Sequence, residues 1–189
     1  MNKTDAPENP WQTHKQEVVY ENPWLRVTES QVTHPGGGPG IYGVVHFKTR
    51  AIGIIPIDRN DCTRLVGQYR YATSTYEWEI AAGGCPEGEE PEAAALRELQ
   101  EETGLIADDL ELLLENVALS NSVTDERCTI YVATGLTQGE ANPEDCELLA
   151  IRTVPVDEAI HMAMNGDIVD GVSVLGLLKL GIMRSNRSI

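Results

Sequence analysis

The sequence predicts an α/β protein of the α+β kind, in which a mixed sheet lies between helices and follows a small antiparallel sheet. Three observations support this fold class. Residues 17–49 contain short stretches of alternating polarity, which are typical of half-buried strands. Residues 51–57 are almost all apolar, which favours a strand buried on both faces. Helical patterns occur only later, after several further strands, and this order is typical of a layered domain.

The first 49 residues divide into a polar terminus and a β region. Residues 1–16 are polar and contain two prolines, so we expect them to be poorly ordered. We expect residues 17–49 to form the N-terminal β region and residues 50–189 to form the main domain. The glycine-rich stretch 34–40 predicts a turn. The strands expected before and after it are 18–20, 24–33 and 41–49.

The main domain is predicted to continue with strands and three helices. The expected strands are 51–57, 64–71, 76–82, 110–118, 128–136 and 148–154. The expected helices are 91–103, 157–165 and 172–183. The polar stretches 58–62, 120–126 and 137–147 are expected to be turns or loops. In the second helix, which ends at a glycine, the side chains expected to point inward are Ala159, Ile160, Ala163 and Met164.

The boundaries of the first helix follow from its own residues. Pro91 suits a first helical position, and Gly104 suits the left-handed residue just after a helix. Between them the chain is rich in helix formers, with Ala95, Leu96 and Leu99 expected on one buried face.

Another face of this helix is strongly acidic. Glu98 and Glu102 are four residues apart and Glu101 is three from Glu98, so their carboxylates share one stripe. Like charges at this spacing repel unless a cation lies among them, and Arg97, four residues before Glu101, is expected to neutralise only one of them. Carboxylates without neighbouring His or Cys suit a hard divalent cation such as Mg²⁺ or Mn²⁺. The alternative is a solvated acidic helix face.

The stretch 83–105 resembles the Nudix box. It matches every fixed position of Gly-x5-Glu-x7-Arg-Glu-U-x-Glu-Glu-x-Gly-U, where U is apolar. The resemblance implies a Nudix-type α/β/α sandwich. It also implies metal-dependent hydrolysis of the pyrophosphate in a nucleoside diphosphate linked to another group, with Mg²⁺ as the cofactor and Mn²⁺ as a substitute.

The resemblance also implies roles for individual residues. Glu98 and Glu102 are expected to bind metal, together with the main-chain carbonyl of Ala82. Glu101 is expected to be a further ligand, directly or through water, and we count it among the candidate catalytic residues. Arg97 is expected to orient the glutamates, and Glu89 to brace the loop before the helix.

Outside the box, the chain resembles the ADP-ribose and nucleoside diphosphate sugar pyrophosphatase branch. Gln68-Tyr69-Arg70, Glu79 just before the box, and the acidic loop 137–147 carry this resemblance. It implies a catalytic glutamate on that loop, for which Glu147 is the first choice and Glu144 the second. It also implies that Arg70 and Glu79 contact the substrate.

The same branch implies further contributions to the substrate site. Glu126 stands where the branch has a loop glutamate, and we expect it to bind substrate. Such enzymes form homodimers through their N-terminal strands, in which an aromatic side chain stacks on the nucleobase. Trp24 is the candidate for that role and Tyr20 could also serve, with core packing as the alternative reading of both.

Two departures from the branch leave the substrate open. Residues 120–123 lack a proline that ADP-ribose enzymes often carry, and Ala81 stands where proline is common. The alternatives are GDP-mannose, a nucleoside triphosphate and a dinucleoside polyphosphate. A nucleotide-binding module without catalysis is the alternative of a different class.

Composition limits the partners and the compartment. The formal net charge is −16, from 30 acidic and 14 basic residues, which disfavours nucleic acid and anionic membranes as partners. The four cysteines are scattered and lack zinc-site spacing. With no apolar leader at the N-terminus, free thiols favour a cytoplasmic protein.

Overall fold

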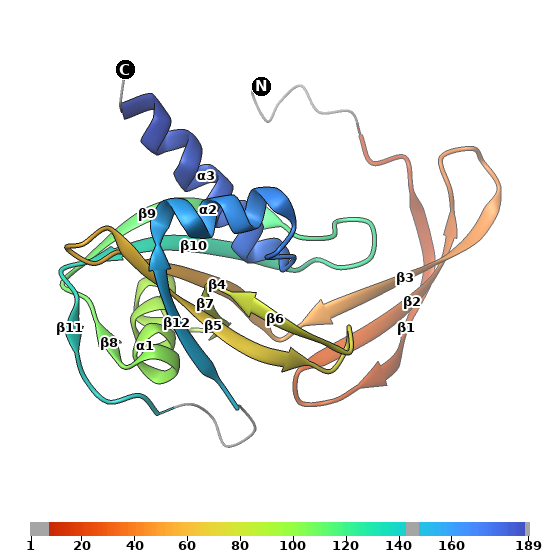
Figure 1. Ribbon diagram of the computed structural model, residues 1–189. Coiled ribbons are helices and arrows are strands. Elements are labelled where there is room, and N and C mark those ends of the chain that lie inside the picture. The colour runs from red at the N-terminus through yellow and green to blue at the C-terminus, as the bar shows by residue number, and fades with distance from the viewer. Residues whose placement is uncertain (1–7, 143–147, 188–189) are drawn as a thin grey trace. The chain divides into compact units, whose positions relative to one another are not determined.

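The computed structural model describes residues 8–142 and 148–187. The chain divides into two compact units, one made of residues 1–48 and 120–126 and the other of residues 49–119 and 127–189. Both predicted parts of the fold are present, namely an N-terminal antiparallel sheet and a mixed α+β domain with three helices (Figure 1).

The N-terminal unit is a three-stranded antiparallel sheet with the strand order β1-β2-β3. Its strands are β1 (Gln12–Glu21), β2 (Leu25–Thr33) and β3 (Pro39–Phe47). The first strand therefore begins before residue 17, within the stretch that was expected to be poorly ordered. In the β1–β2 turn, Asn22 Oδ1 accepts hydrogen bonds from the N–H groups of Trp24 and Leu25, at 2.9 and 2.8 Å. This arrangement fixes the turn in the way Asn side chains commonly do.

The larger unit contains the remaining strands and all three helices. Its strands are β4 (Thr49–Pro56), β5 (Cys62–Arg70), β6 (Thr75–Glu79), β7 (Ala81–Pro86), β8 (Leu105–Ile106), β9 (Asp109–Ala118), β10 (Arg127–Thr134), β11 (Thr137–Gln138) and β12 (Ala150–Pro155). Its helices are α1 (Pro91–Thr103), α2 (Val156–Asn165) and α3 (Gly171–Arg187). None of the described helices has the length and apolar run needed to cross a bilayer.

Two sheets form the centre of this unit. One has the order β7-β4-β10-β9 and is mixed, because β4 and β10 are parallel while the outer pairs are antiparallel. The other has the order β12-β5-β6 and is antiparallel.

Helices cover the mixed sheet on both sides (Figure 1). Ile52 and Ile54 of β4 pack in the same apolar cluster as Ala94, Ala95 and Leu99 of α1. The opposite cluster contains buried side chains of both α2 and α3 and two central strand residues, Ile55 and Ile130. Apolar side chains therefore leave β4 in both directions, as predicted for 51–57, and the helices and sheets form the expected three layers.

Three details differ from the sequence-based expectation. Leu96 is 38% exposed, and Ala94 takes its place in the buried face of α1. Met164 is 64% exposed while Met162 is buried. The buried face of α2 is therefore rotated by part of a turn from the face that the sequence predicted. The stretch expected as one strand over 76–82 is two strands, because the chain changes from one sheet to the other at Ile80.

One connection of the larger unit belongs to the N-terminal unit. Residues 120–126 join β9 to β10 in sequence, yet they pair with β3. Val45 N–H donates to Val123 O at 2.9 Å, and Tyr42 O–H donates to Ser122 O at 2.7 Å. His46 Nδ1 lies 2.6 Å from Asp125 Oδ2, which gives this strand histidine a structural partner.

Candidate active site

Helix α1 begins and ends where its residues predict. Pro91 occupies the first turn, and Gly104 adopts a left-handed conformation with φ of 71°. The N–H of Gly104 donates to Gln100 O at 2.8 Å, which closes the last turn. The glutamates that follow Arg97 are therefore held on a regular helix that packs against β7.

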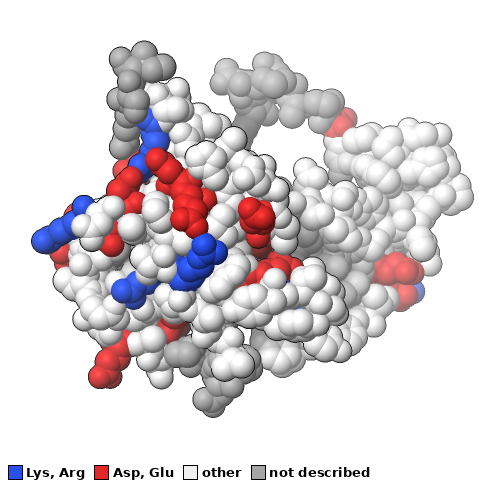
Figure 2. Space-filling view, in the orientation of Figure 1, with Lys and Arg blue, Asp and Glu red and all other residues white. Residues whose placement is uncertain are grey.

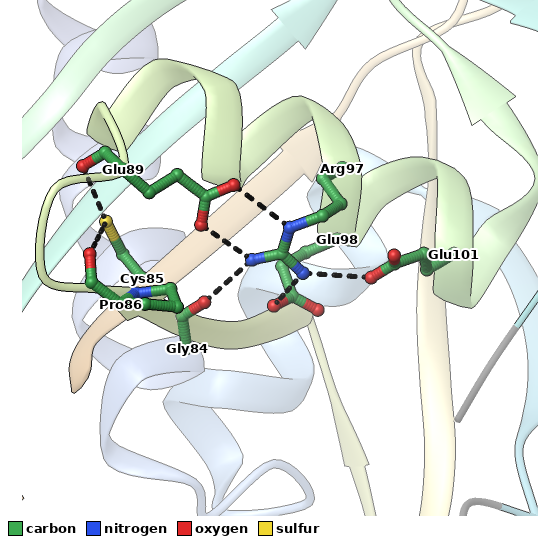
Figure 3. Close-up of polar contacts among 7 residues, drawn as sticks. All are labelled: Gly84, Cys85, Pro86, Glu89, Arg97, Glu98 and Glu101. Carbon is green, nitrogen blue, oxygen red and sulfur yellow. Dashed lines mark hydrogen bonds and ion pairs between the residues drawn. The ribbon is translucent and has the colours of Figure 1, made fainter. Parts of the chain in front are cut away.

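Arg97 is the centre of a polar network that joins α1 to the chain before it (Figure 3). Its Nη1 donates to Glu98 Oε1 at 2.8 Å and to Glu101 Oε2 at 2.9 Å. Its Nη2 donates to Gly84 O at 2.8 Å and to Glu89 Oε2 at 3.0 Å, and Nε donates to Glu89 Oε1 at 3.1 Å. Arg97 thus orients the glutamates by ion pairing, as expected.

These contacts also keep the Glu89–Arg97 pair ionised. The hydrogen bond from Arg97 holds the pKa of Glu89 below its usual value. Hydrogen bonds to Glu89, Glu98 and Glu101 raise the pKa of the Arg97 guanidinium further above its already high value. The bidentate Glu89–Arg97 pair therefore braces the turn between β7 and α1, since its partners stay charged at neutral pH.

The remaining glutamates of the box lie against β7. A Cβ added to Gly83 would lie 2.1 Å from Glu98 Cδ, so the Glu98 carboxyl group occupies the space that any side chain at residue 83 would need. Glu102 is 4% exposed, and its Oε2 accepts the Ala82 N–H at 3.0 Å. The structure thus brings Glu98 and Glu102 to two adjacent residues of β7, Gly83 and Ala82.

The side chains present here fit a divalent cation. Glu98, Glu101 and Glu102 supply carboxylate oxygens, which are the donors that Mg²⁺ and Mn²⁺ prefer. Among residues 8–142 and 148–187, no three acidic, His or Cys side chains already converge on one point. Arg97 Nη1 donates to both Glu98 and Glu101, through one oxygen of each carboxylate.

Arg70 and Glu79 form a second charged pair on neighbouring strands. Glu79 is 2% exposed and receives two hydrogen bonds from the guanidinium, one of them from Nε at 2.7 Å. The pKa of Arg70 is raised, mainly by this hydrogen bond and also by the charges of Asp170 and Glu102. Arg70 therefore lies within the field of Glu102 of α1, and part of its side chain remains exposed.

Replacing Arg70 with methionine is expected to lower the free energy of unfolding by about 3 kcal/mol, because Glu79 would stay buried without its cation. The double variant Arg70→Met/Glu79→Leu should recover most of this loss, as judged by urea denaturation. Arg152→Met is the matched control, since both partners of its ion pair with Glu158 are 44% exposed, and it should cost less than about 1 kcal/mol. A double variant no more stable than Arg70→Met would contradict this account.

The other predicted site residues belong to the N-terminal unit or fall outside the described residues. Trp24 and Glu126 belong to the N-terminal unit, where Trp24 is 73% exposed and the Glu126 N–H donates to Thr124 Oγ1 at 3.0 Å. Glu144 and Glu147 lie outside the described residues. The sequence analysis did not identify the Gly84 carbonyl as an acceptor for Arg97. The two adjacent glycines, Gly83 and Gly84, were a signal that side chains could come close to the backbone there.

Comparisons with known proteins match both parts of the chain. The NUDIX domain matches residues 47–171, and the nucleoside diphosphate sugar hydrolase N-terminal domain matches residues 11–45. The chain is 32% identical over 176 residues to the ADP-ribose pyrophosphatase of Mycobacterium tuberculosis, covering 90% of this chain and 83% of that protein. It is 29% identical to the ADP-sugar pyrophosphatase of Mus musculus, covering 77% and 73% of the two chains. A crystal structure of an ADP compounds hydrolase superposes with a TM-score of 0.83 at 23% identity, covering 94% and 95%.

Proposed function

We propose that this chain, which belongs to the Nudix hydrolase family, cleaves the pyrophosphate bond of an ADP-ribose-like nucleoside diphosphate sugar. The products would be a nucleoside monophosphate and a sugar phosphate, and the reaction would depend on Mg²⁺, with Mn²⁺ as a substitute. The observation that carries this proposal is the placement of Glu98 and Glu102 on Ala82 and Gly83, braced by Arg97. The named relatives support the choice of substrate class.

The residues of the site have separate tasks in this reaction. A divalent cation bound here would screen the charge of the diphosphate and acidify its bound water. Glu98, Glu101 and Glu102 would hold it, with the Ala82 carbonyl as a main-chain ligand. The Ala82 N–H keeps Glu102 in place, while Glu144 or Glu147 would provide the base that removes a proton from the attacking water.

The charge of the chain favours a role for the cation. With a formal net charge of −16, the chain as a whole repels an anionic substrate, and Figure 2 shows acidic side chains, with some Lys and Arg beside them, on the face it displays. Arg97 is already committed to three glutamates. The cation and the exposed part of Arg70 are therefore the expected sources of attraction for the diphosphate.

A substrate panel tests this proposal. We expect ADP-ribose to give the highest kcat/KM among ADP-ribose, GDP-mannose, UDP-glucose, NADH, diadenosine polyphosphates and nucleoside triphosphates, with Mg²⁺ present. Excess EDTA should abolish turnover, and the products should be separated by anion exchange. Preference for a triphosphate or a dinucleoside polyphosphate would overturn the substrate assignment. Binding of ADP-ribose without hydrolysis of any nucleotide would support the non-catalytic module instead.

The N-terminal unit carries the proposed homodimer contact. Its sheet buries few side chains, whereas several of its large apolar side chains are exposed. These are Trp11, Val18, Val19, Tyr20, Trp24, Ile41 and Phe47. A small three-stranded sheet with this surface gains stability by covering it, and a second copy would do so while bringing Trp24 to a nucleobase.

Light scattering after size exclusion tests the dimer. The unmodified chain should elute at twice its 20.7 kDa mass. Val19→Lys, which places a charge on the exposed apolar surface, should shift it toward the monomer, because a buried ammonium is costly. Thr13→Lys on the same strand is the matched control and should leave the mass unchanged. A monomeric unmodified chain at micromolar concentration would refute the homodimer.

A further inference from the structure

The chain changes from one sheet to the other at a single residue, Ile80. Glu79 is the last residue of β6 and pairs with Val66 of β5, whereas Ala81 is the first residue of β7 and pairs with Ile54 of β4. Ile80 belongs to neither ladder and is only 1% exposed. Its N–H therefore needs an acceptor from another part of the core, since an unpaired buried N–H is costly.

Ser173 in the first turn of α3 provides this acceptor. The Ile80 N–H donates to Ser173 Oγ at 2.9 Å, and Ser173 is completely buried. The same hydroxyl donates to Asp170 Oδ2 at 2.7 Å, and that oxygen also accepts the Ser173 N–H at 2.8 Å. Because its proton goes to a carboxylate, the hydroxyl oxygen is a better acceptor for the Ile80 N–H.

The anchored residue lies directly before the part of β7 that meets the glutamates. Ala82 donates its N–H to Glu102 at 3.0 Å, two residues after Ile80. Gly83 lies under the carboxyl group of Glu98, where no space for a Cβ remains. Only Ala81 separates Ile80 from Ala82, and Gly83 follows at once, so we expect a displacement at Ile80 to disturb both contacts.

We propose that Ser173, held by Asp170, is a positioning residue for the divalent-cation site. It fixes the backbone at Ile80 and thereby the place where β7 meets Glu98 and Glu102. The inference rests on the proposed metal-dependent function, and it assigns a role in that function to the start of α3. Groups that hydrogen-bond a metal ligand directly typically change metal affinity by about 10- to 100-fold, and Ser173 acts one step further out, so an effect at the lower end of this range is expected.

Mn²⁺ binding to the purified full-length chain tests the role of Ser173 without substrate. Free Mn²⁺ is measured by electron paramagnetic resonance during titration. Ser173→Ala should weaken Mn²⁺ binding by about tenfold, and Ser173→Thr, which keeps the hydroxyl, should restore most of it. The Mg²⁺ concentration for half-maximal turnover should rise in Ser173→Ala by a similar factor. If Ser173→Ala fails to fold, Ser173→Cys, which keeps the volume and weakens the hydrogen bond, carries the same prediction.

Leu177→Ala separates positioning from a general loss of stability. Leu177 lies on the same helix and is completely buried. It packs in the apolar cluster that contains buried side chains of α2 and α3. This variant should lower Tm at least as much as Ser173→Ala and bind Mn²⁺ like the unmodified chain. Unchanged Mn²⁺ affinity in Ser173→Ala, or equal losses in both variants, would overturn the inference while leaving the proposed function intact. Absence of Mn²⁺ binding to the unmodified chain would overturn both.

Discussion

Replacing Glu98 or Glu102 with glutamine is expected to lower kcat by about three orders of magnitude. Each variant loses a charged oxygen donor, and metal ions contribute several kcal/mol of charge stabilisation in such reactions, at about 1.4 kcal/mol for each factor of ten. The fold should be retained, because an amide oxygen can still accept the Ala82 N–H that Glu102 now accepts. Steady-state kinetics at saturating Mg²⁺ and circular dichroism measure the two effects.

A glutamate on the same helix serves as the control for these variants. Glu92 is exposed in the first turn of α1, so Glu92→Gln removes the same charge from the helix and should leave kcat within about twofold, as is usual for surface substitutions. Turnover close to that of the unmodified chain in Glu98→Gln or Glu102→Gln would refute their assignment as metal ligands.

Gly83→Ala is expected to lower kcat by about a hundredfold, the size of effect that a displacement of about 1 Å has in an active site. The added methyl group would lie 2.1 Å from Glu98 Cδ, so either the carboxyl group or β7 must move. Because Glu98 also receives a hydrogen bond from Arg97 at 2.8 Å, the movement is expected to disturb the whole network. The Mg²⁺ dependence of turnover should shift to higher concentration.

Gly171→Ala is the matched control for the glycine substitution. Apart from the glycine itself, its two chain neighbours and the nearby backbone of its own helix, no atom lies within 4 Å of the Cβ that it would add, and the glycine has no left-handed backbone. This variant should keep the kinetics of the unmodified chain. If Gly83→Ala also kept the kinetics of the unmodified chain, catalysis would not depend on the present position of the Glu98 carboxyl group beside β7, which would contradict this account.

The box helix shows how far sequence reasoning reaches. Pro91 and Gly104 are local signals, and the helix lies between them as predicted. The ion pair of Arg97 with Glu101 also follows from local spacing, since residues four apart on a helix are neighbours. The ion pair of Arg97 with Glu98 does not follow from this rule, because adjacent residues do not face each other on a helix. The helix and the Arg97–Glu101 pair could be predicted because each depends on residues close together in the chain.

Features that depend on distant residues were not predicted. The break at Ile80 exists because two sheets meet there, and its partner Ser173 is 93 residues away. The exposure of Leu96 depends on which face of α1 packs against β4 and β7. Such pairings are set by the packing of whole elements, which the local pattern does not contain.

The most direct test of the central claim is phosphorus NMR of ADP-ribose incubated with the chain and Mg²⁺. The account predicts that the two pyrophosphate resonances disappear together and that two phosphomonoester resonances replace them, one for the nucleoside monophosphate and one for the sugar phosphate. Glu102→Gln and excess EDTA should each leave the pyrophosphate resonances in place. Persistence of those resonances with the unmodified chain, or their conversion in the presence of EDTA, would contradict metal-assisted cleavage by the α1 glutamates.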